Sequence, residues 1–162
     1  MTPAIKLLEK AGVAHKIHEY KHDVGNSAYG LEAAEKLGLD PRQVFKTLVV
    51  KLDDRSLAVA ILPVSGMLSM KAMAKALSGK KAELADKTEV ERSTGYVLGG
   101  VSPLGQKKRL RTVIDSSAAS LDSMFVSAGR RGLEIELTPA HLQSLTQALM
   151  TPLRLCVVPG PN

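Results

Sequence analysis

Lys46 is the residue of this 162-residue chain whose type and setting most directly suggest chemistry. It opens the run Lys-Thr-Leu-Val-Val, in which the apolar positions 48 and 50 would share its face in a strand. A lysine there either extends along apolar surface to the edge of the sheet or offers a point charge to an anionic or carbonyl group in a pocket. The residue types alone leave both interpretations open.

A glycine-rich turn with the sequence GGVSPLG begins at Gly99 and is the second candidate. Its three glycines would let backbone amides approach a ligand closely, and Ser102 adds a hydroxyl. The same composition also suits a tight connection between two strands.

Two basic segments could meet phosphate groups. Lys107, Lys108 and Arg109 follow the glycine turn directly, and Arg130 and Arg131 lie in a glycine-flanked loop after an expected strand. A solvated charged turn is the commoner role of such a loop. Taken together, however, Lys46, the glycine turn and the basic loop favour a pocket for a small group on an anionic polymer or nucleotide, without identifying a reaction.

No standard catalytic or metal-binding motif is present. The four histidines lack His-Glu-x-x-His spacing, so no metal site is expected. Cys156, the only cysteine, lies in an apolar run and is predicted to be a buried structural thiol rather than a nucleophile.

Composition bounds the class of protein. Hydrophobic residues make up 44% and charged residues 23%, which excludes a disordered or collagen-like chain. The longest apolar runs are far shorter than the ~20 residues of a membrane span, and the first residues read as an amphipathic helix, so we expect a cytoplasmic protein without a membrane partner. The net charge of +6 makes a polyanionic partner plausible, but aromatic residues are only 3%, so a base-stacking platform is not expected.

The elements that must position these residues follow from periodicity and cap signals. Helices are expected over residues 3–11, 29–37, 68–77, 86–93 and 139–150, with Ser65 as a cap of the third and a helical turn after Asp40-Pro41. Strands are expected over residues 15–20, 44–52, 57–64, 82–84, 110–115, 124–127, 133–137 and 155–158, some of them weakly. Six or seven strands with four or five helices predict an α+β or α/β fold: a mixed, partly closed barrel-like sheet surrounded by helices.

Several segments together resemble the YbaK/EbsC family of bacterial aminoacyl-tRNA deacylases. They include Val44-Phe45-Lys46-Thr47-Leu48, the long block from Arg92 to Arg109, and Val126-Ser127-Ala128-Gly129. The resemblance covers almost the whole chain, and it implies one deacylase domain over residues 1–162.

The resemblance also implies roles for individual residues. Lys46, Gly99 and Ser102 match the catalytic positions; the substrate-binding positions would be Tyr20, Gly100, Val101, Pro103, Ser127, Gly129 and, by residue type only, Glu134. We predict that the tRNA is held by Lys107, Lys108, Arg109, Arg130 and Arg131.

The implied function is removal of cysteine from mischarged Cys-tRNA(Pro), with Cys-tRNA(Cys) as a candidate second substrate, without a cofactor. The substrate's own thiol would attack the ester, and prolyl-tRNA synthetase would be a transient partner. The alternatives are a deacylase for another small amino acid such as alanine, and a non-catalytic module that binds tRNA or a synthetase.

Overall fold

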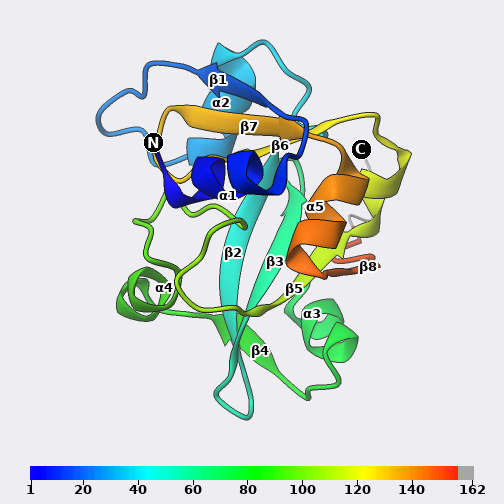
Figure 1. Ribbon diagram of the computed structural model, residues 1–162. Coiled ribbons are helices and arrows are strands. Elements are labelled where there is room, and N and C mark those ends of the chain that lie inside the picture. Colours follow the sequence, from blue (N-terminus) through cyan, green and yellow to red (C-terminus); the bar gives the residue numbers. More distant parts are fainter. Residues whose placement is uncertain (157–162) are drawn as a thin grey trace, which may run out of the picture.

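The computed structural model describes residues 1–156 (Figure 1). The helices are α1 (Pro3–Ala11), α2 (Tyr29–Lys36), α3 (Met70–Ala76), α4 (Lys87–Thr94), α5 (Pro139–Thr146) and a short 3-10 helix, η1 (Ser116–Ser120). The strands are β1 (Lys16–Glu19), β2 (Phe45–Leu52), β3 (Leu57–Pro63), β4 (Ala82–Leu84), β5 (Arg111–Asp115), β6 (Met124–Ser127), β7 (Leu133–Leu137) and β8 (Leu149–Thr151).

The strands form two sheets. A five-stranded mixed sheet has the order β4-β2-β3-β5-β8, in which β2 and β3 form an antiparallel hairpin and β5 runs parallel to β3 and β8. A three-stranded antiparallel sheet has the order β1-β7-β6. The sheets adjoin where Val44 bridges Phe125, but the barrel does not close. The predicted α+β class with a partly closed sheet is therefore confirmed.

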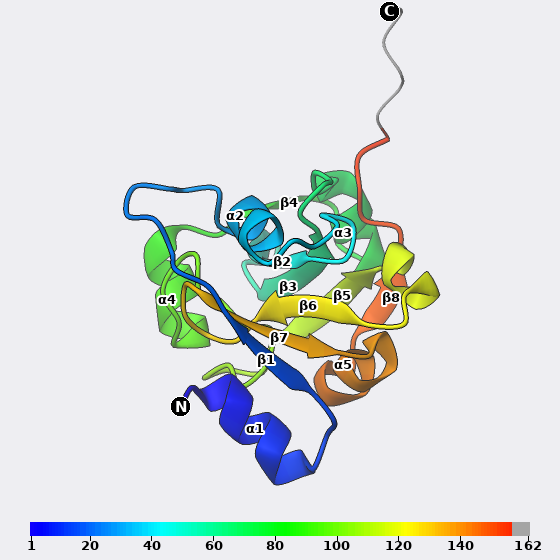
Figure 2. The same cartoon turned by 90° about the horizontal axis from the view of Figure 1, so that it is seen from above.

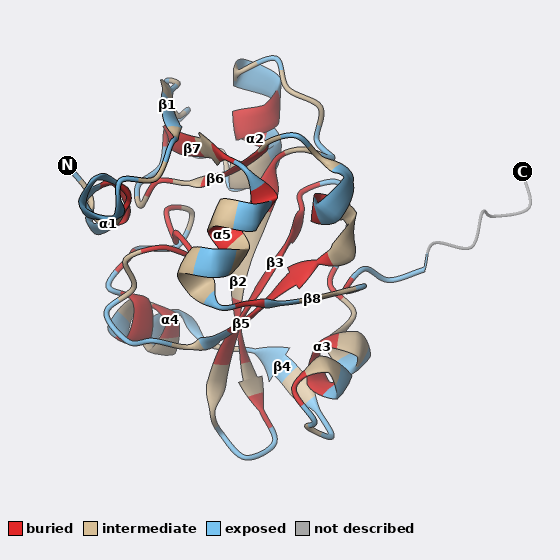
Figure 3. Ribbon diagram, turned by 45° about the vertical axis from the view of Figure 1, so that its right-hand side comes forward, coloured by how far each residue is buried: buried red, intermediate tan, exposed pale blue. Residues whose placement is uncertain are grey.

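The main core lies between the two sheets, with α1 and α5 packed against it. Leu8, Ile61, Ile114 and Ile135 are all fully buried there. Figure 3 shows the long buried stretches of β3 and β5, and Figure 2 shows α1 on the side of the three-stranded sheet away from α2. A second cluster, around Met73, packs α3 against the other face of β2 and β3.

Helix caps explain where several helices begin. The hydroxyl of Thr2 accepts a hydrogen bond from the amide of Ile5, and the Asp86 carboxylate caps α4 in the same way. Ser69 caps α3, so the expectation of Ser65 as its cap is wrong. The segment after Asp40-Pro41 is a hydrogen-bonded turn rather than a turn of helix.

The expected last helix is too long. Gln147 adopts a left-handed φ of 53°, which ends α5 and lets residues 149–151 add to the sheet as β8 beside β5. Leu155 and Cys156 lie outside any strand, and the rest of the strand expected over residues 155–158 lies outside the described residues. Cys156 and the preceding Leu155 are exposed, so the predicted burial of Cys156 is wrong.

One edge of β2 is only partly covered, and this feature positions the site. β4 pairs with β2 from Val50 to Leu52, and β6 bridges the chain at Val44, just before β2 begins. The stretch of β2 between these two contacts therefore faces open space instead of another strand.

Candidate active site

A cavity of about 500 Å³ lies beside this uncovered stretch of β2. Its walls come from β2, from the start of α2 and the loop before it, from the glycine turn and from the β6–β7 pair. The residues around it are Tyr20, Ser27, Ala28, Tyr29, Gly30, Leu31, Phe45, Lys46, Thr47, Leu48, Val49, Val64, Leu84, Ala85, Val90, Leu98, Gly99, Val101, Ser127 and Glu134. A mostly apolar wall with a few polar groups is typical of a small-molecule site.

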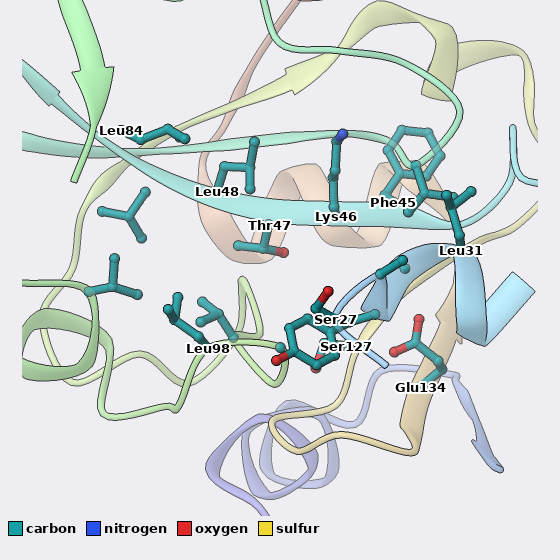
Figure 4. Close-up of a pocket in the computed structure, with 18 of the residues that line it drawn as sticks. Ser27, Leu31, Phe45, Lys46, Thr47, Leu48, Leu84, Leu98, Ser127 and Glu134 are labelled. Atoms are coloured by element: carbon teal, nitrogen blue, oxygen red, sulfur yellow. The ribbon is translucent and has the colours of Figure 1, made fainter. Parts of the chain in front are cut away.

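Successive residues of β2 beside the cavity point to opposite sides of the strand. Lys46 and Leu48 extend from one face, and Thr47 extends from the other, toward Ser27 and Ser127 (Figure 4). Burial lowers the pKa of the Lys46 ammonium group, because a partly desolvated charge is disfavoured. Lys46 therefore adjoins the cavity as a partly desolvated amine.

Glu134 and Ser127 face one another across the β6–β7 pair and contribute polar groups to the same wall. Glu134 is only 6% exposed, and burial raises the pKa of its carboxyl to about 8. The pKa of Tyr20 is raised first by its own burial and then by the nearby Glu134. Glu134 is thus largely protonated at neutral pH in the empty cavity.

Glu32 holds the loop that precedes α2. Its buried carboxylate lies 2.6 Å from Nδ1 of His22 and accepts a 2.9 Å hydrogen bond from the amide of Asp23. Burial alone would raise the pKa of Glu32, but these hydrogen bonds outweigh it and lower the pKa. The anchored loop brings Ser27 and Tyr29 to the cavity.

Arg131 joins the glycine turn to α2. Its guanidinium donates two hydrogen bonds to the carbonyl oxygen of Leu98, at 3.0 and 2.6 Å, and lies 4.8 Å from the centre of the Tyr29 ring. Gly99 has a φ of +87°, and a Cβ there would approach both Tyr29 and Arg131 to 2.8 Å. Only glycine fits at this junction.

The structure brings six of the predicted site residues to the cavity. They are Lys46, Gly99, Tyr20, Val101, Ser127 and Glu134. Their catalytic and binding roles stay predictions, but they come from four separate segments and share one site.

Four predicted site residues, Gly100, Ser102, Pro103 and Gly129, are not among the residues that line the cavity; the first three lie in the glycine turn and Gly129 lies in the β6–β7 loop. Ser102 is fully buried, and its hydroxyl accepts a hydrogen bond from the amide of Leu104. A Cβ on Gly100 would meet the backbone of Arg130 at 2.7 Å, and one on Gly129 would meet the Tyr96 ring. Ser102, Gly100 and Gly129 are thus closely packed within their own loops, and the roles predicted for them and for Pro103 stay predictions.

The predicted tRNA-binding residues lie apart from the cavity lining. Arg130 pairs with Glu19 at 3.1 Å, and Arg131 is engaged by Leu98 and Tyr29. The amides of Lys107 and Lys108 bond to the last turn of α4, and Arg109 borders a second, smaller hollow.

Sequence reasoning missed Ser27, Tyr29 and Thr47. Thr47 is adjacent to Lys46, but strand alternation places it on the opposite face of the strand, for which the sequence pattern predicted no site. Ser27 and Tyr29 follow a polar loop whose path depends on the buried Glu32, a contact that no local pattern indicates.

The described residues show neither a metal-ligand cluster nor a helix that could span a membrane. Within residues 1–156, no three histidine, cysteine, aspartate or glutamate side chains gather closely enough to hold a metal ion. No helix in the same part of the chain is both long and apolar enough to cross a bilayer.

Known proteins are similar to this chain in sequence and in fold. The model of the aminoacyl-tRNA editing domain family matches residues 27–145. Enterococcus faecalis EbsC, provisionally named a Cys-tRNA(Pro)/Cys-tRNA(Cys) deacylase, is 36% identical over 90% of this chain and 88% of its own length. A proline–tRNA ligase of Desulforamulus reducens is 30% identical over 62% of this chain, which is 17% of the ligase.

A solved structure described as a candidate trans-editing enzyme for prolyl-tRNA synthetase has the same fold. It covers 96% of this chain and 99% of its own, with a TM-score of 0.83 at 22% identity. The family match and the EbsC identity each span most of the chain, as the motifs predicted. The chain therefore belongs to the aminoacyl-tRNA editing domain family, the YbaK/EbsC family, and is an aminoacyl-tRNA deacylase.

Proposed function

We propose that this protein removes cysteine from mischarged Cys-tRNA(Pro), acting in trans as one domain. The observation that carries the proposal is a cavity with a desolvated lysine and a buried carboxyl but with neither histidine nor cysteine among its described lining residues. Such a site holds an ester well but offers no conventional nucleophile–base pair. A substrate that brings its own nucleophile suits it.

The substrate thiol supplies that nucleophile. A free thiol has a pKa near ~8.5, so some thiolate exists at neutral pH, and intramolecular placement greatly raises its effective concentration. The thiolate sulfur attacks the ester carbonyl carbon, the bond from that carbon to the ribose oxygen breaks, and the oxygen takes up a proton. The products are deacylated tRNA and a cyclic thioester of cysteine.

The protein holds the ester and stabilises the charge that develops on its carbonyl oxygen. Lys46 and the backbone amide of Gly99 are our candidates, because both line the cavity. Glu134 is our candidate for the α-ammonium group of the substrate, since an entering cation would lower the carboxyl pKa and favour the carboxylate.

We further propose that prolyl-tRNA synthetase presents the tRNA. Support comes from the Desulforamulus ligase, which contains a related segment in the same chain as its synthetase. A separate editing protein would then need only a transient contact with the synthetase.

The test is loss of the ester from Cys-tRNA(Pro), Ala-tRNA(Pro) and Ser-tRNA(Pro), with Cys156→Ser as a control variant. We expect rapid loss from the cysteinyl ester only, unchanged in Cys156→Ser because the exposed Cys156 is outside the cavity lining. Equal rates for the cysteinyl and seryl esters would exclude the thiol mechanism. Turnover of the alanyl ester would indicate hydrolysis by water, and loss of none of the esters would indicate a binding module.

A further inference from the structure

Thr47 carries a buried hydroxyl that lacks a hydrogen-bond partner. Among the described residues, only Thr47 Oγ1 and His141 Nδ1 are buried side-chain polar atoms without one, and of these two residues only Thr47 lines the cavity. Its side chain extends toward Ser27 and Ser127 across the cavity (Figure 4). Buried polar groups are nearly always satisfied in native structures, so this exception needs an explanation.

The backbone of Thr47 faces the same space. Peptide groups in an antiparallel strand alternate between its two edges. The carbonyl of Val44 accepts a hydrogen bond from Val64 on the β3 side, whereas the carbonyl of Val49 accepts one from Ala85 on the other side. Thr47 lies two residues before Val49 in the strand. Its amide and carbonyl therefore point to the same side as those of Val49, toward the edge that β4 and β6 leave uncovered.

We propose that Thr47 is a substrate-binding residue whose hydroxyl hydrogen-bonds a polar atom of the aminoacyl group. The inference rests on the proposed function, because it takes the aminoacyl ester as the occupant of the cavity. A hydroxyl both donates and accepts, so it can bond the ester carbonyl, the amino group or the thiol.

The proposal predicts opposite effects of Thr47→Val on stability and on turnover. An unpaired buried hydroxyl costs stability in the empty protein, and replacing it by a methyl group of the same shape removes that cost. Valine also suits a strand as well as threonine does. Thr47→Val should therefore leave the free protein at least as stable as wild type while it weakens turnover.

A matched threonine supplies the control. Thr112 in β5 is a buried residue, and its hydroxyl, unlike that of Thr47, has a partner: it donates a 3.0 Å hydrogen bond to the carbonyl of Leu110. Thr112→Val removes a satisfied bond and should unfold at lower urea concentration than wild type. Thr47→Ser keeps the hydroxyl in the cavity and should restore function.

The experiment measures urea unfolding and kcat/KM on Cys-tRNA(Pro) for wild type, Thr47→Val, Thr47→Ser and Thr112→Val. For Thr47→Val we expect an unfolding midpoint no lower than wild type and a roughly tenfold loss of kcat/KM, with Thr47→Ser close to wild type. Wild-type turnover in Thr47→Val, or an unfolding midpoint as low as that of Thr112→Val, would overturn the inference. If wild type deacylates no ester, the proposed function fails, and the unfolding comparison still decides whether the hydroxyl is unpaired.

Discussion

Lys46 is an ammonium group that the fold keeps partly out of water beside a substrate-sized cavity. Burial lowers the pKa of Lys46, because the charged ammonium loses favourable contacts with water. A ligand with a negative or carbonyl oxygen would offset this desolvation penalty. It is therefore the side chain whose removal should affect the reaction most and the fold least.

We expect Lys46→Ala to lower kcat on Cys-tRNA(Pro) by about a hundredfold or more, as removal of a donor to a developing oxyanion does. Lys46→Arg should also be poor, because a planar guanidinium does not replace a compact ammonium. Circular dichroism should show an intact fold in both variants. Near-normal turnover of a folded Lys46→Ala protein would remove Lys46 from the mechanism.

Glu134 should make stability depend on pH in a direction opposite to that of most carboxyls. Its pKa is about 8 in the folded chain against a usual 4.5, so the folded chain holds more protons between these values. The free energy of unfolding must then fall as pH rises through this window, with a slope of at most about 1.4 kcal/mol per pH unit from this group. Glu134→Gln should remove that slope.

The measurement is the free energy of unfolding from pH 5 to pH 8 for wild type and Glu134→Gln. The difference between the two curves isolates the carboxyl from the other titrating groups. Parallel curves would mean that Glu134 keeps an ordinary pKa in the folded protein.

At the scale of elements, the cavity depends on contacts between segments that are distant in the sequence. The β6–β7 loop carries Arg131, Leu98 directly before the glycine turn supplies its carbonyl, and α2 supplies the Tyr29 ring. The absence of a side chain at Gly99 lets the three segments close together.

We expect Arg131→Ala to impair turnover through the cavity wall rather than through tRNA phosphates. Its loss of activity should be similar on Cys-tRNA(Pro) and on cysteinyl-adenosine, a small ester that lacks the tRNA phosphates. Arg130→Ala, which removes an exposed ion pair with Glu19, is the matched control and should have little effect on either substrate. A defect of Arg131→Ala confined to the full tRNA would show a phosphate contact instead.

Elements with local signals could be predicted from the sequence, and those that depend on distant partners could not. The strands β2 and β3 and the helices α1 and α4 lie close to the ranges that their local patterns predict. β8 was expected as helix, because its pairing with β5 is set by tertiary contacts rather than by residues 149–151.

The same distinction holds for the site. Lys46 could be found from its apolar strand together with the family resemblance, whereas Ser102 carries the right residue type but is fully buried inside its own turn. The unpaired hydroxyl of Thr47 depends on where β4 and β6 stop, which no local pattern indicates.

At the scale of the whole molecule, the net charge of +6 is spread over a chain with few aromatic residues. Binding of tRNA should therefore rest on phosphate contacts, which release counterions and carry no sequence information. Arg130 and Arg131 already have partners within the fold, which leaves Lys107, Lys108 and Arg109 as our main candidates.

We expect tRNA affinity to fall steeply between low and physiological salt, and Lys107→Ala and Lys108→Ala each to reduce the salt slope by about one. Lys71→Ala removes the same charge from α3, which lies on the other side of β2 from α4 and the two lysines bonded to it (Figure 1). It should leave the slope unchanged, which separates a local contact from an effect of net charge. Because phosphate contacts do not read sequence, the isolated protein should bind tRNA(Pro) and tRNA(Cys) alike, and added prolyl-tRNA synthetase should favour Cys-tRNA(Pro). The measurements are equilibrium binding over a range of salt concentrations and deacylation of both cysteinyl-tRNAs with and without the synthetase. A strong, salt-insensitive preference of the isolated protein for tRNA(Pro) would instead demonstrate direct reading of the tRNA by this chain.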